Sequence, residues 1–245
     1  MTTGMARKPT KAKPAPPKPR RGPTGRITIW VYKGVLAMFG LTVLAIILFA
    51  AVNPPTTPYM FAEGRRLDGG VQQQWVAMDR IAPVMARSVV AAEDANFCLH
   101  WGLDMTAIRA AMDAGGARGA STISQQVVKN VYLWQGRSWF RKAIEAVITP
   151  AVEAVWTKRR ILEVYLNVVE FDKGVFGVQA AAQGYFGVDA ADLTATQAAR
   201  LAAVLPDPKG RSAANPSDYL RRQARRIVDG AATIAADGRA DCFQP

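Results

Sequence analysis

The sequence predicts an all-α protein with a single membrane-spanning helix near its N-terminus, and three observations lead to this prediction. Residues 34–52 form an uncharged apolar run, close to the ~20 residues that a helix needs to cross a bilayer core. Several later segments place apolar residues at helical spacing, whereas the alternating pattern of strands is nearly absent. A chain of 245 residues without internal repeats has room for one folded domain besides these appendages.

Positive charge is concentrated at the N-terminus. The net charge is +12, and residues 1–26 hold eight Lys and Arg residues but no acid, in a Pro-rich context. Such a segment cannot bury enough apolar surface to fold, so we expect residues 1–26 to be a disordered tail. A pI of about 10.1 would ordinarily suggest nucleic-acid binding. Because most of the excess charge lies in this tail, we expect no nucleic acid as a partner.

Residues 27–52 are predicted to be an uncleaved membrane anchor. The basic residues all precede the apolar run, so the positive-inside rule places the tail in the cytoplasm and the remainder on the periplasmic face of the cytoplasmic (inner) membrane. The alternative is a cleaved signal peptide, whose apolar region is usually only about 7 to 15 residues long. Residues 53–70 are expected to be a linker, because Pro54, Pro55 and Pro58 stop the helix.

The exported domain is expected to cover residues 71–245 and to be built from helices. Apolar periodicity predicts them at residues 81–92, 105–112, 144–155, 157–168, 180–185 and 198–205. Ser121 or Thr122 can cap a further helix after the glycine-rich loop 115–119, and Thr194 with Gln197 forms a capping box. Pro150 should kink the long helix in which it lies.

The chain has two cysteines, Cys98 and Cys242, and both lie in the part expected to be exported. An oxidising compartment permits a disulfide, and two cysteines can form one bridge. The alternative is two small hydrophobic side chains at unrelated places in the fold.

Two adjacent acids, Glu93 and Asp94, end an apolar helix, and the only histidine, His100, follows them. A carboxyl group partly removed from water has a raised pKa, as a general acid or base working near neutrality needs. The ordinary alternatives are a solvated acid pair at a helix end and a histidine that forms hydrogen bonds in the core.

A second polar cluster follows the glycine-rich loop, with Ser121, Gln125, Gln126 and Lys129 on the next helix. Backbone amides at a helix start, with hydroxyls and a lysine nearby, suit an anion or a sugar. The segment is not a Walker P-loop, because no Gly-Lys-Ser/Thr occurs at the required place. A merely well-capped helix is the alternative, but it leaves two consecutive glutamines unexplained.

Basic side chains cluster at the starts of two later helices. Arg141 and Lys142 precede Glu145, which is compatible with an ordinary helical ion pair or with a site for a diphosphate. Residues 158–160 are also basic, and positive charge at a helix start opposes the macrodipole, which hints at a specific use.

Five ordered segments resemble the peptidoglycan glycosyltransferases, found as monofunctional enzymes and as domains of bifunctional penicillin-binding proteins. The segments are E-D-x-x-F-x-x-H-x-G (93–102), G-x-S-T-I-S-Q-Q-V-V-K-N (119–130), R-K-x-x-E (141–145), I-L-E-V-Y-L-N (161–167) and L-A-A-V-L-P (201–206). The resemblance covers roughly residues 71–230. Ala120, where the family often has a second glycine, and Pro150 are the departures, and they bear on the flexibility of the loop and the line of the helix.

The resemblance implies a lysozyme-like all-α fold and an inverting glycosyl transfer. The donor would be the growing glycan strand on undecaprenyl diphosphate, and the acceptor the GlcNAc 4-hydroxyl of lipid II. By this resemblance, Glu93 is the catalytic base with Asp94 as a supporting acid, and Glu145 is the second catalytic carboxylate. Residues expected to bind substrate are Asp94, His100, Ser121, Gln125, Gln126, Lys129, Arg141 and Lys142, with the three cations on the leaving diphosphate.

The expected partners are lipid II, the growing lipid-linked strand and the membrane, and other cell-wall synthesis proteins stay open. Aromatic residues from Tyr132 to Phe140 interleave with Arg137 and Arg141, a mixture suited to the bilayer interface, although a packed core hairpin is the alternative. No cofactor is required by the sequence, and no cluster at ligand spacing requires a metal, although assistance by a divalent cation stays open.

Two other functions compete with polymerisation. A lytic transglycosylase-like hydrolase would share the fold and one glutamate, but its substrate carries no diphosphate for the cations to bind. An inactive membrane-tethered scaffold of the cell-wall machinery is a rival of another class, although it would need neither glutamate. No Ser-x-x-Lys occurs in the exported domain, so we expect no transpeptidase activity.

The one-sided charge and the long apolar run predict an exported C-terminus. A reporter that is active only outside the cytoplasm, fused after Pro245, should therefore be active. A silent reporter, or a mature N-terminus near Ala51, would contradict the anchor.

Overall fold

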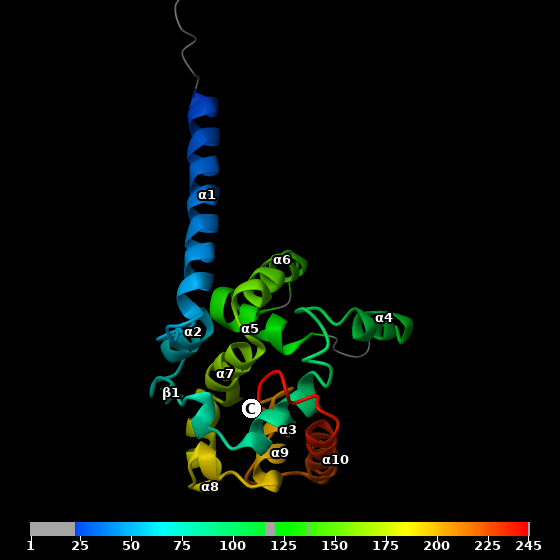
Figure 1. The fold of residues 1–245 in the computed structure, drawn as a ribbon. Helices are drawn as coiled ribbons and strands as arrows, with labels where there is room; N and C mark the ends of the chain where they lie inside the picture. Colours follow the sequence, from blue (N-terminus) through cyan, green and yellow to red (C-terminus); the bar gives the residue numbers. More distant parts are fainter. Residues whose placement is uncertain (1–22, 116–120, 137, 245) are drawn as a thin grey trace, which may run out of the picture. The chain divides into compact units, whose positions relative to one another are not determined.

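The computed structural model describes residues 23–115, 121–136 and 138–244, which divide into a unit ending at Val43 and a compact unit from Leu44 onward (Figure 1). Most of the predicted tail, the glycine-rich loop beyond Gly115, and Arg137 lie outside the described residues. The first unit consists of most of α1 (Pro23–Phe49). Its segment Ile27–Phe49 has a mean hydropathy of 2.1 and is long and apolar enough to cross a membrane, in agreement with the predicted span.

The compact unit is mainly helical, so the predicted all-α class is confirmed. Its elements after α1 are α2 (Pro58–Arg66), β1 (Gln72–Gln73), η1 (Met78–Arg80), α3 (Pro83–Glu93), α4 (Met105–Asp113), α5 (Ile123–Tyr132), α6 (Trp139–Val155), α7 (Lys158–Val168), β2 (Glu170–Asp172), β3 (Val175–Phe176), α8 (Val178–Phe186), η2 (Ala190–Asp192), α9 (Ala195–Val204) and α10 (Asp218–Ala236). Each helix predicted from apolar periodicity is present, with shifted ends. The sequence analysis did not predict α10, or α2 within the segment expected as a linker.

Two groups of helices build the unit. Helices α3, α9 and α10 pack on one another and lie side by side in Figure 1. Helix α5 packs between α6 and α7 and also contacts α2. A small sheet in the order β1-β3-β2 covers the end of α8, with β1 parallel and β2 antiparallel to β3. Glu93 at the end of α3, Gln126 on α5 and Glu145 on α6 come from both groups of helices.

Helix α5 begins with a capping box. The side chain of Thr122 accepts a hydrogen bond from the Gln125 backbone, and the Gln125 side chain accepts one from the Thr122 backbone at 3.0 Å. Thr122 rather than Ser121 is therefore the N-cap of α5. Gln125 is buried, and its side chain takes part in this capping box. The capping box predicted at Thr194 and Gln197 is likewise present at the start of α9.

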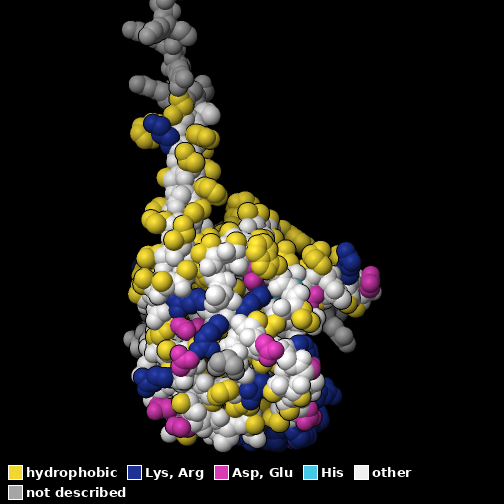
Figure 2. All heavy atoms as spheres, viewed as in Figure 1, with side chains coloured by type: hydrophobic (Ala, Val, Ile, Leu, Met, Phe, Trp, Pro, Cys, Tyr) yellow, Lys and Arg dark blue, Asp and Glu magenta, His cyan; other side chains and the backbone are white. Residues whose placement is uncertain are grey.

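Helix α6 is inverted relative to an ordinary surface helix, in the sense that its buried face is mostly polar and several apolar side chains are exposed. Its buried residues are mostly polar: Arg141, Glu145, Thr149, Val152 and Glu153. Several of its large apolar side chains face outward, and Trp139 is 92% exposed and Val147 76%, whereas Val152 is buried. Figure 2 shows hydrophobic side chains gathered on the surface where α6 lies in Figure 1. The helix continues through Pro150 without ending there, and the kink expected at Pro150 stays a prediction.

The basic start of α7 ties three segments together. Lys158 pairs with Glu153 of α6 at 2.8 Å. Arg159 pairs with Asp79 and donates to the Phe243 carbonyl at 3.1 Å. Arg160 donates to the Phe49 and Val52 carbonyls at the end of α1. These contacts explain why positive charge at this helix start is tolerated against the macrodipole.

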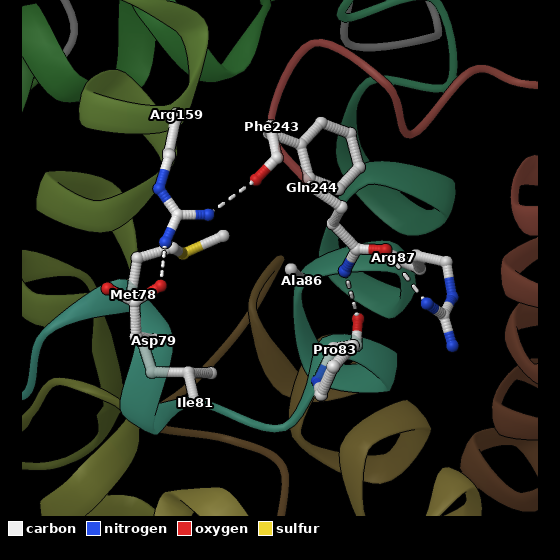
Figure 3. A pocket seen from close by; sticks show the side chains of 9 residues that line it. All are labelled: Met78, Asp79, Ile81, Pro83, Ala86, Arg87, Arg159, Phe243 and Gln244. Atoms are coloured by element: carbon white, nitrogen blue, oxygen red, sulfur yellow. Dashed lines mark hydrogen bonds and ion pairs between the residues drawn. The ribbon is translucent and has the colours of Figure 1, made fainter.

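The C-terminal tail is fastened to α3 and α7. Cys98 and Cys242 form a disulfide with 5.7 Å between their Cα atoms, so the predicted bridge is present. Beyond it, Phe243 is fully buried, and Gln244 accepts a hydrogen bond from Arg87 at 2.8 Å and donates one to the Pro83 carbonyl at 2.7 Å. These contacts border a hollow of about 330 Å³ (Figure 3).

The disulfide should stabilise the domain, because it closes a loop with a sequence separation of 144. The chain-entropy model gives an upper figure of about 4 to 5 kcal/mol for a loop of this length. The double substitution Cys98→Ala/Cys242→Ala should therefore lower the denaturant midpoint of the full chain in detergent. Equal midpoints for the bridged protein and the double variant would contradict this account.

Candidate active site

The site is assembled from residues of three helices. Glu93 is the last residue of α3, Gln126 and Lys129 lie on α5, and Glu145 lies on the buried stripe of α6. The structure thus brings together both glutamates that the sequence analysis singled out. Beside Glu93, a cavity of about 210 Å³ is lined by residues that include Asp94, Ser121 and Thr122.

Glu93 is partly buried and makes one hydrogen bond. Its Oε2 accepts a hydrogen bond from the Gln126 side-chain amide at 2.8 Å. Burial raises the pKa of Glu93 above its usual value of 4.5, while Gln126, Lys129 and Arg211 act in the opposite direction and Asp94 adds to the rise. A carboxylate with a raised pKa is suited to accept a proton near neutral pH.

Glu145 differs from Glu93 because two cations hold it. Arg141 pairs with one carboxylate oxygen at 2.8 Å, and Lys142 pairs with the other. The Lys142 ammonium also donates to the Ser121 hydroxyl at 2.9 Å. The Glu145 carboxylate is buried, so this pairing offsets the cost of removing its charge from water. Ser121 is thereby drawn to the cationic side of the site.

The charge of Lys129 interacts with both Glu93 and Glu145. Burial lowers the pKa of Lys129, Glu145 and Glu93 raise it, and Arg141 and Lys142 lower it. Within residues 23–115, 121–136 and 138–244, the Lys129 ammonium has no hydrogen-bond acceptor. An ammonium without a protein partner, in a site with two further cations, can bind an anionic ligand.

Asp94 and His100 form hydrogen bonds that stabilise the arrangement of the helices at the site. The Asp94 carboxylate accepts hydrogen bonds from the Ile123 backbone at 3.0 Å and from His100 at 2.9 Å. Asp94 thus fastens the end of α3 to the start of α5. The structure places both residues beside Glu93, and their contacts favour a positioning role over direct binding of substrate.

The segment 93–102 ends at Gly102, where its backbone passes close to α6. Gly102 has φ +82°, and its carbonyl accepts the Thr122 hydroxyl at 2.6 Å. A Cβ atom at this position would lie 2.7 Å from a Thr149 methyl group on α6. The glycine therefore lets the segment pass against the helix that carries Glu145.

Two groups near the site were given no role on the basis of the sequence. Arg211 follows α9, donates to the Ala203 carbonyl at 2.9 Å and lowers the pKa of Glu93. Glu153 is buried on α6 and accepts hydrogen bonds from Ser124 and Lys158. The position of Glu153 two turns after Glu145 was a usable signal, whereas no local pattern marked Arg211. Among the described residues, no group of three or more His, Cys, Asp and Glu side chains could hold a metal ion.

The site combines a partly buried carboxylate, Glu93, with a group of cations that can bind an anion. A family model described as transglycosylase matches residues 63–232, and the chain belongs to this family. The family indicated by the five sequence segments is therefore confirmed.

Three similar proteins are each called "Biosynthetic peptidoglycan transglycosylase". The protein from Jannaschia sp. (strain CCS1) is 64% identical over 214 residues, covering 87% of this chain and 89% of the relative. The one from Caulobacter vibrioides is 45% identical, covering 82% and 89%. The one from Xanthomonas oryzae is 46% identical, covering 87% and 89%.

The raised pKa of Glu93 predicts how the stability of the fold changes with pH. Because the folded state holds the proton more tightly than the unfolded state, stability present below the usual pKa of 4.5 is lost as the pH rises through the folded value. The neutral substitution Glu93→Gln should therefore raise the melting temperature at pH 7.5 and leave it nearly unchanged at pH 4. Asp68→Asn, which neutralises an exposed acid, should have little effect at either pH. A variant that melts below the wild type at pH 7.5 would contradict the assigned burial cost.

Proposed function

We propose that this chain polymerises the glycan strands of peptidoglycan on the periplasmic face of the cytoplasmic membrane. It transfers the growing strand from undecaprenyl diphosphate to the GlcNAc 4-hydroxyl of lipid II, with inversion at the anomeric carbon. The observation that carries the proposal is the Lys129 ammonium, which has no hydrogen-bond partner among the residues that the structure describes and interacts electrostatically with Glu93, Glu145, Arg141 and Lys142. The names of the similar proteins support the same substrate.

Glu93 is the base in this reaction. Its carboxylate takes the proton from the acceptor 4-hydroxyl as the oxygen attacks C1 of the donor sugar. The new C1–O bond forms on the face opposite the departing diphosphate, which leaves with the electron pair of the broken bond. Partial burial supports this role, because it raises the proton affinity of the carboxylate.

The cations stabilise the charge that develops on the leaving diphosphate. Arg141 can make bidentate contacts to phosphate oxygens, and Lys129 and Lys142 act as point charges. Glu145 holds Arg141 and Lys142 in place before the substrate arrives. Fixed cations of this kind lower the barrier, because they need no reorganisation when the negative charge appears.

The inverted helix α6 supports docking to the membrane that carries the lipid-linked substrate. Trp139, Phe140 and Val147 are highly exposed, and Trp134 is 47% exposed just before α6. Tyr132 and Leu133 turn toward the core instead, so the aromatic surface is formed by the later residues. The Trp156 indole at the end of α6 donates to the Ile46 carbonyl at 2.7 Å, near the end of the apolar anchor segment. An apolar helix face beside the end of an anchor suits the bilayer interface.

Two alternatives make different demands on the site. A hydrolase acting on finished glycan has no diphosphate to bind, so it does not account for three cations beside Glu145. An inactive scaffold does not account for a partly buried Glu93 with an available carboxylate oxygen.

The full chain in detergent should polymerise lipid II, and Glu93→Gln should reduce the rate by roughly 10²- to 10⁴-fold, as loss of a general base predicts. Lipid II binding should persist, because the substitution conserves shape. Degradation of finished peptidoglycan by a wild-type protein that cannot extend lipid II would overturn the proposal in favour of a hydrolase. Inactivity toward both substrates would favour the scaffold.

Lys142→Ala should weaken a diphosphate-bearing inhibitor, since the lysine contacts the anion in the ground state as well. Isothermal titration against the full-length protein measures this change. Lys173→Ala removes the same charge from an exposed turn and serves as the control. Equal inhibitor affinity for both variants would contradict the role of the cations.

A further inference from the structure

The buried hydroxyl of Tyr165 is connected to the catalytic base through one side chain. Tyr165 lies on α7, has no exposed surface and donates a hydrogen bond to Gln126 Oε1 at 3.1 Å. The Gln126 amide nitrogen in turn donates to Glu93 Oε2 at 2.8 Å. A continuous path of two hydrogen bonds therefore runs from the core of α7, through α5, to the end of α3.

We propose that Tyr165 is a positioning residue for the reaction, which through Gln126 fixes the Glu93 carboxylate and leaves Oε1 as the atom that accepts the proton. This inference rests on the proposed function, because it assigns a supporting residue to the same base. The Tyr165 hydroxyl does not touch the substrate and acts only by orienting the Gln126 amide.

The orientation of the Gln126 amide follows from its two partners. With the amide reversed, its carbonyl oxygen would face the ionised Glu93 carboxylate, and the two would repel. The Tyr165 proton would also lose its acceptor, since the part of the chain that the structure describes offers it only Gln126 Oε1. A buried donor without an acceptor is unfavourable, so both ends of the path select the same orientation.

The two Glu93 oxygens are thereby made different. Oε2 is occupied by Gln126, whereas Oε1 has no hydrogen-bond donor within the described ranges. Because Glu93 lines the cavity of about 210 Å³, the unoccupied oxygen is the one available to an acceptor hydroxyl.

Three titratable groups shift the pKa of Glu93. Lys129 of α5 and Arg211 after α9 favour the ionised carboxylate, and the adjacent Asp94 opposes it. On α7, burial raises the pKa of Tyr165 well above its usual value, so its hydroxyl stays protonated and remains a donor. Gln126 alone among the described side chains donates a hydrogen bond to the carboxylate, so its orientation should govern the proton affinity of Glu93 directly.

Carbon-13 NMR titration of the glutamate carboxyl groups in the full chain in detergent tests the inference. The chain has six glutamates, and Glu93→Gln identifies the signal of Glu93. In Tyr165→Phe, the pKa of Glu93 should rise by about one pH unit, in line with a weakened hydrogen bond to a charged group. The acidic limb of the kcat/KM profile for lipid II should move in the same direction, with KM little changed.

Tyr132→Phe is a matched control, because the buried Tyr132 hydroxyl has no hydrogen-bond partner among the described residues. It should leave the Glu93 titration unchanged. Gln126→Leu should raise the pKa of Glu93 at least as much as Tyr165→Phe does. Adding Tyr165→Phe to Gln126→Leu should then cause no further change, because the path is already broken.

An unchanged Glu93 titration in Tyr165→Phe would overturn the inference, as would a further shift when Tyr165→Phe is added to Gln126→Leu. A lower melting temperature with a wild-type titration would mean that the hydroxyl serves only stability, and would also overturn it. The titration needs no substrate. Failure of the wild type to extend lipid II, with the titration shifts present, would therefore refute the proposed function and leave the positioning of Glu93 intact.

Discussion

The need to satisfy buried carboxylates organises the helices of this domain. An ionised carboxylate taken from water destabilises the fold unless cations or hydrogen-bond donors replace the lost solvation. Glu145 is held by Arg141 and Lys142, and Glu153 by Ser124 and Lys158. Both carboxylates face inward on α6, and the contacts of Glu153 join this helix to α5 and the start of α7. By contrast, the Lys129 ammonium and one oxygen of Glu93 have no hydrogen-bond partner among the described residues. Both groups can therefore contact a ligand.

The same constraint accounts for the surface of α6. A helix that turns its polar stripe inward must turn its apolar stripe outward, as the exposed Trp139 and Val147 demonstrate. In water such a surface is unfavourable, but at a bilayer interface it becomes a docking face. The proposed cleft for a lipid-linked substrate and the proposed membrane-facing surface therefore lie on opposite faces of one helix.

Helix α7 connects distant parts of the chain to Glu93. Its Arg160 donates hydrogen bonds to two backbone carbonyls at the end of the apolar anchor segment and just after it, and its Arg159 donates one to the tail beyond Cys242. Asn167, at the other end, exchanges hydrogen bonds with the Val76 backbone. Between these ends, Tyr165 reaches the Gln126 amide beside Glu93. A core helix that is fixed at both ends can hold a catalytic carboxylate with little freedom, which preorganised catalysis requires.

The sequence by itself determined the helical class, the apolar span and the family, and it singled out most residues of the candidate site, because apolar periodicity, capping patterns and ordered polar segments are local signals. Only the tertiary structure decided that Thr122 rather than Ser121 caps α5, that Gln126 contacts Glu93, and that α6 is inverted. Periodicity reports that a helix has an apolar face but not which way that face points. Arg211 and the partner of Tyr165 also stayed hidden, because their contacts join residues far apart in the chain, and only packing brings such residues together.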